Sequence, residues 1–326
     1  MFGSHLSVAG GLVNALTAAG ALRLDTVQVF TKNQRQWSVP PLDAGAAREW
    51  LTELKRLGWA DRTVSHDSYL INLASPDDSL WERSIAAMRE EIERAAALSI
   101  PFLVSHPGAH MIKDGAMTPE ERIEAGLRRI ARAYKRLLKE TKGFAVTVCL
   151  ENTAGGGTTL GRTFEELSRL RELIVEEAGG EAEGRIGFCV DTCHALAAGY
   201  DIAARGADGT ERSRSEGEAL GRAMLERFDE LCGIDHLRVL HLNDSLGKCG
   251  SRVDRHAHIG RGEVSLGAFS AVVNHRGLDS VPMILETPKE DDDRGVPMDT
   301  VNVEVLRSLA REKKASAGRT PARIRR

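Results

Sequence analysis

The chain has 326 residues, of which 42% are hydrophobic and 28% are charged, a composition typical of a globular protein with a sizeable core. No run of about 18 apolar residues occurs, which excludes a membrane-spanning helix, and the first residues lack the features of a signal peptide. The net charge of −3 disfavours a nucleic-acid partner unless bound divalent metals add positive charge near the phosphates.

The five cysteines are few, odd in number and scattered along the chain. Such usage is typical of reduced thiols in a cytoplasm and does not indicate a disulfide framework. Cys189 and Cys193 are spaced closely enough to suggest a zinc pair. Because Cys189 lies in the apolar run Ile186–Thr192, however, a buried free thiol is the favoured interpretation.

Eight short β-rich runs alternate with longer segments whose apolar residues recur at the helical period, most clearly in Ser79–Leu98. In chain order the expected strands are Phe2–Leu6, Thr26–Phe30, Thr63–Asp67, Pro101–His106, Ala145–Asn152, Ile186–Thr192, Arg238–Asp244 and Pro282–Thr287. This alternation predicts an α/β fold, a single (β/α)8 TIM barrel over residues 1–310. A doubly wound open sheet is the alternative, but the first strand-to-helix turn lacks the Gly-x-Gly-x-x-Gly fingerprint.

Three segments fall outside the barrel pattern. Val175–Arg185 and Ala203–Leu220 are polar or glycine-rich, and we expect surface loops in both. Residues 311–326 carry seven Lys or Arg against one Glu. They predict a basic, disordered tail that either solubilises the protein or attracts nucleic acid without sequence preference.

Ionisable side chains end nearly every predicted strand. The C-terminal strand ends of a TIM barrel converge on one face and hold the active site. Imidazoles and carboxylates buried together need a charge partner, and a divalent metal supplies one. The strand-end residues are His5, His66, His106, Glu151, Asp191, His241 and Glu286.

Three more candidate ligands follow these strands. His194 lies three residues beyond Asp191, and Asp254 and His256 alternate in the loop Gly250–Gly262, so that their side chains share one side. With His5 beside the site rather than in it, nine nitrogen and oxygen ligands suit up to three ions. The imidazoles favour zinc, although manganese suits the same donors. Clustered ions favour phosphate chemistry.

Long blocks of the chain resemble the endonuclease IV family of apurinic/apyrimidinic (AP) endonucleases, which repair DNA. The matching blocks are His5–Leu12, Val29–Trp37, His66–Pro76, His106–His110, Leu150–Gly161, Asp191–Asp201, Leu240–Ser245, Gly250–Gly262 and Ile284–Pro288. The resemblance implies three Zn²⁺ ions, one of whose sites could instead hold Mn²⁺. His66 and His106 would hold the first ion and share Glu151 as a catalytic bridge with the second; Asp191, His241 and Glu286 would complete the second site, and His194, Asp254 and His256 would hold the third.

The resemblance further implies a reaction and a substrate. The family hydrolyses the phosphodiester 5′ to an abasic site in double-stranded DNA with a metal-bound hydroxide, leaving 3′-hydroxyl and 5′-deoxyribose phosphate ends, and it trims blocked 3′ ends. Arg35, Tyr69 and Leu70 match residues that enter the minor groove beside the flipped abasic nucleotide. Lys32 and Arg252 are expected phosphate contacts. Between the histidines of Gly250–Gly262, the family register selects His256 over His258. We expect a monomer.

Two other functions are compatible with parts of this pattern. A single-metal sugar isomerase or epimerase on the same barrel would use Glu151, Asp191, His241 and Glu286, but would leave the other five ligands without a role. A non-catalytic binder of damaged DNA would hold zinc for structure alone. Structural zinc sites are usually rich in cysteine, whereas these ligands are all histidine and carboxylate.

Overall fold

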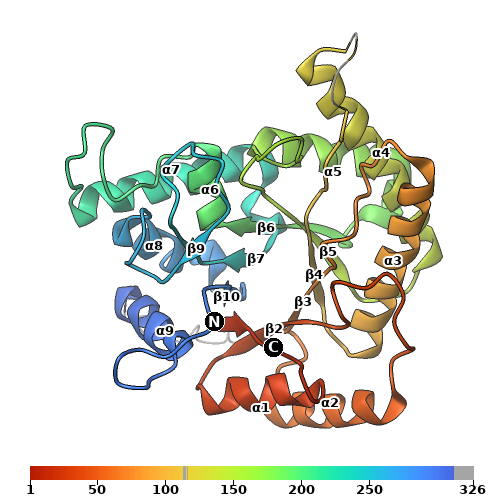
Figure 1. Cartoon of the computed structure of the whole chain (residues 1–326), viewed down its shortest axis with the longest axis horizontal. Coiled ribbons are helices and arrows are strands. Elements are labelled where there is room, and N and C mark those ends of the chain that lie inside the picture. The colour runs from red at the N-terminus through yellow and green to blue at the C-terminus, as the bar shows by residue number, and fades with distance from the viewer. Residues whose placement is uncertain (113–114, 116, 312–326) are drawn as a thin grey trace, which may run out of the picture.

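Eight parallel strands close into a barrel in a computed structural model that describes residues 1–112, 115 and 117–311 (Figure 1). Around the barrel they follow the order of the chain. Their bounds are β1 (Phe2–His5), β2 (Thr26–Phe30), β3 (Val64–His66), β4 (Phe102–Ser105), β5 (Thr147–Glu151), β6 (Ile186–Asp191), β7 (Leu237–His241) and β10 (Met283–Leu285). Each strand overlaps its predicted range, and the TIM-barrel prediction is confirmed.

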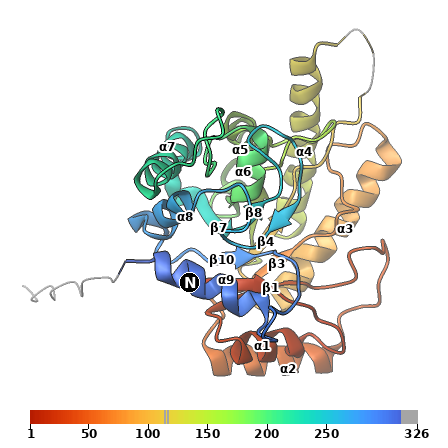
Figure 2. The ribbon, with the colours of Figure 1, turned by 60° about the vertical axis from the view of Figure 1, so that its left-hand side comes forward.

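Helices surround the barrel on its outside (Figures 1 and 2). They are α1 (Val13–Ala21), α2 (Ala44–Leu57), α3 (Asp78–Ala97), α4 (Pro119–Glu140), α5 (Phe164–Ala178), α6 (Thr192–Ala198), α7 (Arg214–Cys232), α8 (Leu266–Val273) and α9 (Met298–Leu309). Three short 3₁₀ turns accompany them: η1 (Gly179–Ala182), η2 (Ile234–His236) and η3 (Arg276–Leu278). Among the described residues no helix has the length and apolarity needed to cross a membrane.

Two predicted loops are partly helical. Residues 175–178 are the last turn of α5, and 179–182 form η1. Residues 214–220 begin α7, because Ser213 and Glu216 form a capping box that satisfies the free N–H groups at the helix start. Polar composition does not distinguish an exposed helical turn from a loop. Of the predicted tail, only Arg311 belongs to the described residues.

A small apolar layer fills the barrel beneath its C-terminal mouth. It consists of one side chain from each of six strands: Val64, Val104, Cys149, Cys189, Val239 and Ile284, all fully buried. Cys189 is therefore a buried free thiol, as predicted, and none of the five cysteines forms a disulfide. This layer separates the polar mouth from the rest of the core and gives the site a water-excluding floor.

A short hairpin, β8 (Asp244–Ser245) with β9 (His256–Ala257), follows β7. Its two strands are antiparallel, with Ser245 opposite His256. The hairpin draws the loop Gly250–Gly262 back over the mouth of the barrel, which places that loop beside the strand ends.

Candidate metal centre

Strand register brings the central carboxylates and imidazole together. Asp191 on β6 pairs with His241 on β7, and His241 pairs in turn with Ile284, two residues before Glu286. Glu151 on β5 pairs with Cys189, two residues before Asp191. Residues two apart on a strand share a face, so these side chains project into the same mouth.

All nine predicted ligands gather in three groups, within each of which the ligand atoms lie within 4.8 Å of one another. The groups are His66, His106 and Glu151; Glu151, Asp191, His241 and Glu286; and His194, Asp254 and His256. The first two groups meet at Glu151. The structure therefore assembles three neighbouring sets of oxygen and nitrogen donors without sulfur.

Cys189 and Cys193 lie near these groups, but their thiols are poor ligands here. Cys189 lies close to Glu151 and His241, and Cys193 close to Asp191. Burial raises the pKa of Cys193 to about 12 and also raises that of Cys189. Both thiols are therefore protonated at neutral pH, whereas the thiolate is the form that binds metal.

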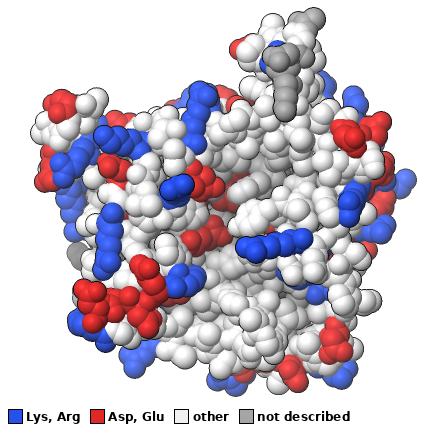
Figure 3. All heavy atoms as spheres, in the orientation of Figure 1, with Lys and Arg blue, Asp and Glu red and all other residues white. Residues whose placement is uncertain are grey.

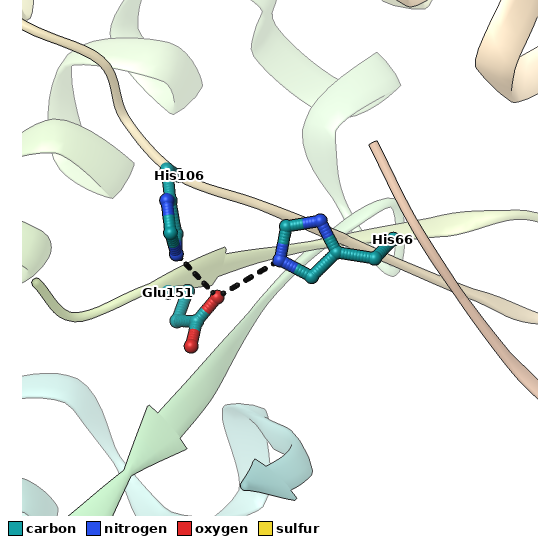
Figure 4. A group of neighbouring side chains, drawn as sticks. All are labelled: His66, His106 and Glu151. Carbon is teal, nitrogen blue, oxygen red and sulfur yellow. Dashed lines mark hydrogen bonds and ion pairs between the residues drawn. The ribbon is translucent and has the colours of Figure 1, made fainter. Parts of the chain in front are cut away.

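Glu151 is fully buried and directs its two oxygens to different partners. Figure 4 shows the imidazoles of His66 and His106 pointing at the same carboxylate oxygen, Oε2, with Nε2–Oε2 distances of 3.3 and 2.9 Å. The other oxygen, Oε1, lies 2.8 Å from Nδ1 of His241 and 3.4 Å from Nδ1 of His194. A carboxylate with this orientation has the geometry of a bridge between two sites.

Four of the histidines have one ring nitrogen bound to an oxygen that can only accept a hydrogen bond. Nδ1 donates to a backbone carbonyl in three of them: His66 to Asp67 (3.0 Å), His194 to Asn152 (2.9 Å) and His256 to Glu286 (3.2 Å). In His241, Nε2 donates to the side-chain oxygen of Gln28 (2.9 Å). Each bond fixes the tautomer of the neutral ring, so that the opposite nitrogen, which faces the carboxylates, is the one that can bind a metal once it has lost its proton.

Two ring nitrogens of the third group agree with a donor set that fits a metal. Nε2 of His194 and Nε2 of His256 are buried and have no hydrogen-bond partner among the described residues. They face the same oxygen of Asp254, at 3.1 and 3.4 Å. Buried polar atoms normally have partners, so two convergent ring nitrogens beside a carboxylate are the arrangement expected around a cation.

The charges of the metal-free site compensate one another. Burial lowers the pKa of His66, but hydrogen bonds and attraction from Asp67 and Glu151 outweigh it and raise that pKa well above its usual value. Burial raises the pKa of Glu151, but His241 and His106 outweigh it and lower that pKa well below its usual value. Protons on the imidazoles thus hold the place of positive charge that a divalent ion can supply.

Sequence reasoning missed the residues that orient the ligands. Asn152 accepts from the Asp191 backbone N–H through Oδ1 (2.7 Å). Asn243 donates to Oδ2 of Asp191 (2.6 Å) and accepts from the backbone N–H of Glu286 (2.7 Å). Asn152 directly follows the ligand Glu151, and Asn243 follows His241 by two positions. This closeness in sequence to two candidate ligands is the signal that could have identified both asparagines.

Asp244, also missed, organises the loop that carries Asp254 and His256. Its buried carboxylate accepts four backbone N–H groups, from Ser245, Gly260, Gly262 and Val264, at 2.8 to 3.0 Å. A Cβ at Gly262 would lie 2.5 Å from the Asp244 carboxylate, so the close approach requires glycine there. One carboxylate thus gathers both ends of the loop.

The two histidines of this loop point in different directions. Nε2 of His256 lies 3.6 Å from Asp191 and faces the metal ligands. His258 is only 7% exposed and turns toward α9, with Nε2 3.0 Å from Glu290 and Nδ1 accepting from Asn302. The geometry therefore agrees with His256, and not His258, as the ligand of this loop.

His5 lies beside the second group without belonging to it. Its Nδ1 is 2.9 Å from Nε2 of Gln28 and 3.3 Å from Glu286. The same Gln28 nitrogen donates to Glu286 (2.6 Å). Burial lowers the pKa of His5, which favours the neutral imidazole. His5 and Gln28 therefore support Glu286 from outside the ligand groups.

The residues expected to contact DNA surround the mouth, with one exception. Tyr69 is 65% exposed, and its ring centroid lies 5.8 Å from that of His66, which excludes ordinary core packing. Arg35 and Arg252 are exposed and Leu70 is half-buried. Figure 3 shows acidic side chains within the central hollow of this face and Lys or Arg around it. A cavity of about 600 Å³ between the loops after β1 and β2 includes Arg35 in its lining.

Lys32 is the exception. Its side chain is 2% exposed, and Nζ lies 3.1 Å from Glu90 and 3.6 Å from Glu91, both on α3. The ammonium group is therefore already paired inside the protein and turned away from solvent. In this structure the ammonium group is therefore not free for the expected phosphate contact, because a basic residue in a loop motif can hold the loop in place.

Comparison with known proteins places the chain among TIM-barrel enzymes. The model of a family described as "Xylose isomerase-like TIM barrel" matches residues 15–311. A "Probable endonuclease 4" of Chloroflexus aurantiacus is 45% identical over 309 residues, covering 94% of this chain and 97% of the relative. Its namesake in Chloroflexus aggregans is 44% identical over 311 residues, covering 95% and 98%.

Solved structures agree with these relatives. Endonuclease IV from Thermus thermophilus superposes with a TM-score of 0.72 at 33% identity, covering 94% of this chain and 98% of that one. A D-tagatose 3-epimerase-like protein superposes with a TM-score of 0.65 at 17% identity, covering 94% and 96%. The second match reflects the shared barrel alone, so the sequence relatives are what separate nuclease from epimerase.

Proposed function

Since this chain belongs to the endonuclease IV family of DNA-repair nucleases, we propose that it hydrolyses the phosphodiester 5′ to an abasic site in double-stranded DNA. The products are a 3′-hydroxyl and a 5′-deoxyribose phosphate, and blocked 3′ ends are trimmed by the same chemistry. The observation that carries the proposal is the set of three neighbouring donor groups, two of which share Glu151. We also propose that the protein carries out this reaction as a monomer in the cytoplasm.

We further propose that the three groups hold three Zn²⁺ ions, with Mn²⁺ as an alternative at one of them. Imidazole and carboxylate donors with fixed tautomers suit zinc, and the two groups of three protein ligands leave a position for water or substrate. Bound ions of this kind activate water near neutral pH and neutralise charge on a phosphate. Glu151 keeps the first two groups adjacent through its two oxygens.

The surrounding residues would select and orient the DNA. Tyr69, Leu70 and Arg35 lie where side chains could enter the groove and fill the space left by a missing base. Unstacking costs less at an abasic site than at an intact base pair, and this difference favours damaged DNA. Arg252 extends from the loop of Asp254 and could pair with a backbone phosphate.

The test is a nicking assay on a duplex with one tetrahydrofuran abasic analogue, which lacks the C1′ hydroxyl and resists β-elimination. Zinc-loaded protein should cut 5′ to the analogue and leave an end that a polymerase extends. Glu151→Gln should lose the nick and bind less zinc, whereas Glu172→Gln, an exposed position on α5, should behave as wild type. An uncut duplex with fully loaded protein would refute the proposal.

A sugar isomerase or epimerase is the second candidate, because the group of Glu151, Asp191, His241 and Glu286 would suffice for a single ion. It leaves His66 and His106, and the whole third group, without a function. Metal analysis separates the two functions: three ions per chain favour the nuclease and one favours the isomerase. A non-catalytic damage binder would instead retain the abasic duplex without cutting it.

A further inference from the structure

The loop between β2 and α2 is fastened to one helix. It spans residues 31–43 and carries Arg35. Lys32 reaches into the protein, where Nζ contacts Glu90 (3.1 Å), Glu91 (3.6 Å) and the carbonyl of Ala87 (3.5 Å), all on α3. Thr31 donates its hydroxyl to the Glu91 carboxylate (3.0 Å), whose residue is 1% exposed.

The same helix holds the loop at three further points. The guanidinium of Arg94 donates to the carbonyl of Thr31 (2.5 and 3.1 Å) and to that of Pro40 (3.4 Å). Arg83 stacks over the ring of Trp37, with its guanidinium carbon 4.4 Å from the ring centroid. Contacts thus begin at the first residue of the loop and recur on both sides of Arg35.

Ser68 joins this loop to its neighbour. Its buried hydroxyl donates to the carbonyl of Gln34 (2.7 Å) and accepts from the backbone N–H of Leu70 (3.3 Å). One side chain therefore links the segment that presents Arg35 to the segment that presents Tyr69 and Leu70. Arg35 itself sits in a turn in which its N–H binds the side chain of Asn33 (2.9 Å).

An ionic cluster of this kind adds little net stability to the attachment of a loop. Desolvating Lys32 and two carboxylates offsets most of the attraction between them, so apolar contacts would give similar stability. What the cluster supplies is a defined geometry. A loop held in its DNA-bound shape loses less conformational entropy on binding.

We propose that the cluster of Lys32, Glu90, Glu91 and Arg94, together with Ser68, positions Arg35, Tyr69 and Leu70 for insertion into DNA. These are positioning residues that act through the two loops and touch neither the metal ligands nor the scissile bond. The inference rests on the proposed function for its substrate. The fastening of the loops can be tested separately.

Two readouts test the proposal with Lys32→Met and the milder Ser68→Ala. Hydrogen exchange of the zinc-loaded protein should show lost protection in residues 31–43 and 68–72, with the barrel strands unchanged. On the abasic duplex, KM should rise about tenfold, the order expected when several side chains must be ordered on binding. The turnover number kcat and the zinc content should stay near wild type. Lys32→Arg should restore most of the affinity.

Controls separate a positioning role from general destabilisation. Arg89→Met removes an exposed charge from the same helix, where Arg89 contacts Glu93 and Glu140, and should change neither readout. In an Arg35→Ala background, Lys32→Met should raise KM less than in wild type, because both changes affect one loop. Unchanged loop protection, or a fall in kcat at constant KM, would overturn the proposal. Protection lost in a protein that does not nick abasic DNA would instead show that the substrate assignment is wrong.

Discussion

Two histidines in one loop offer a sharp test of the metal centre. His256 and His258 are separated by one residue, and both are largely buried, yet only His256 faces the proposed ligands Asp191 and Asp254. His258 instead bonds to Glu290 and Asn302. Replacing each by alanine removes the same chemical group from the same loop, so the two variants control for one another.

The structure predicts different effects for the two substitutions. His256→Ala removes one of three ligands from the third group, which should lower its zinc occupancy and reduce activity by at least about 100-fold, the upper range for disturbing even a supporting ligand contact. His258→Ala removes two hydrogen bonds from a buried site. We expect it to cost about 2 kcal/mol, lowering Tm by about 3 °C for a chain of this size.

The assay combines metal analysis, thermal unfolding and nicking on the same preparations. His256→Ala should bind two zinc ions instead of three after dialysis against limiting zinc and should lose most activity. His258→Ala should keep its zinc and its activity at a temperature well below its lowered Tm. If His258→Ala lost zinc while His256→Ala retained it, the ligand assignment in this loop would be wrong.

Three further predictions follow from buried charges. Asp244→Ala leaves four loop N–H groups without their acceptor. It should lower the zinc stoichiometry of the third group and cost about 3 kcal/mol of stability. An unchanged zinc stoichiometry would count against the role of Asp244 in organising the loop. Zinc affinity should weaken as pH falls, because neighbouring carboxylates raise the pKa values of His66 and His194 and protons then compete with the metal. Calorimetry in buffers of different ionisation enthalpy should detect the protons released when zinc binds. A zinc affinity that does not change with pH would contradict this prediction. Burial raises the pKa of Glu91 to about 7, so the folded state binds this proton more tightly than the unfolded state. Stability is then lost as pH rises from about 4.5 to 7, by about 3 kcal/mol. Glu91→Gln should remove that slope in urea unfolding, whereas parallel curves for the two proteins would refute the assignment.

The barrel and its ligands were predictable because both obey strong local rules. Parallel strands in a barrel are buried on both faces, so they appear as short apolar runs, and all eight were found. Six of the nine candidate ligands stand at strand ends, where a polar side chain interrupts such a run, as Glu151 does after Val148, Cys149 and Leu150. Strand register then brings them together without further information.

The supporting residues were not predictable in the same way. Gln28 lies mid-strand and looks like an ordinary polar residue of β2, yet its amide bonds to His241 on β7, to His5 on β1 and to Glu286 just after β10. Lys32 lies in a motif that matches DNA-contacting residues, and only the position of α3 shows that its charge is paired inside the protein. Both roles depend on contacts between segments far apart in the chain.

The fold alone does not decide the chemistry of this barrel. An epimerase-like protein at 17% identity shares it, and one group of ligands at β5, β6, β7 and the residue after β10 would serve a single-metal reaction. The difference comes from a few additions: His66 and His106 at the ends of β3 and β4, His194 on α6, and Asp254 and His256 in and beside the loop between β8 and β9. Because Glu151 presents one oxygen to His66 and His106 and the other to His241, the added ligands extend the existing group instead of forming a separate one. A sugar isomerase or epimerase stabilises charge at one place on its substrate, so it needs no such extension. A phosphodiester carries charge on several oxygens at once, and cations placed side by side stabilise that charge during hydrolysis.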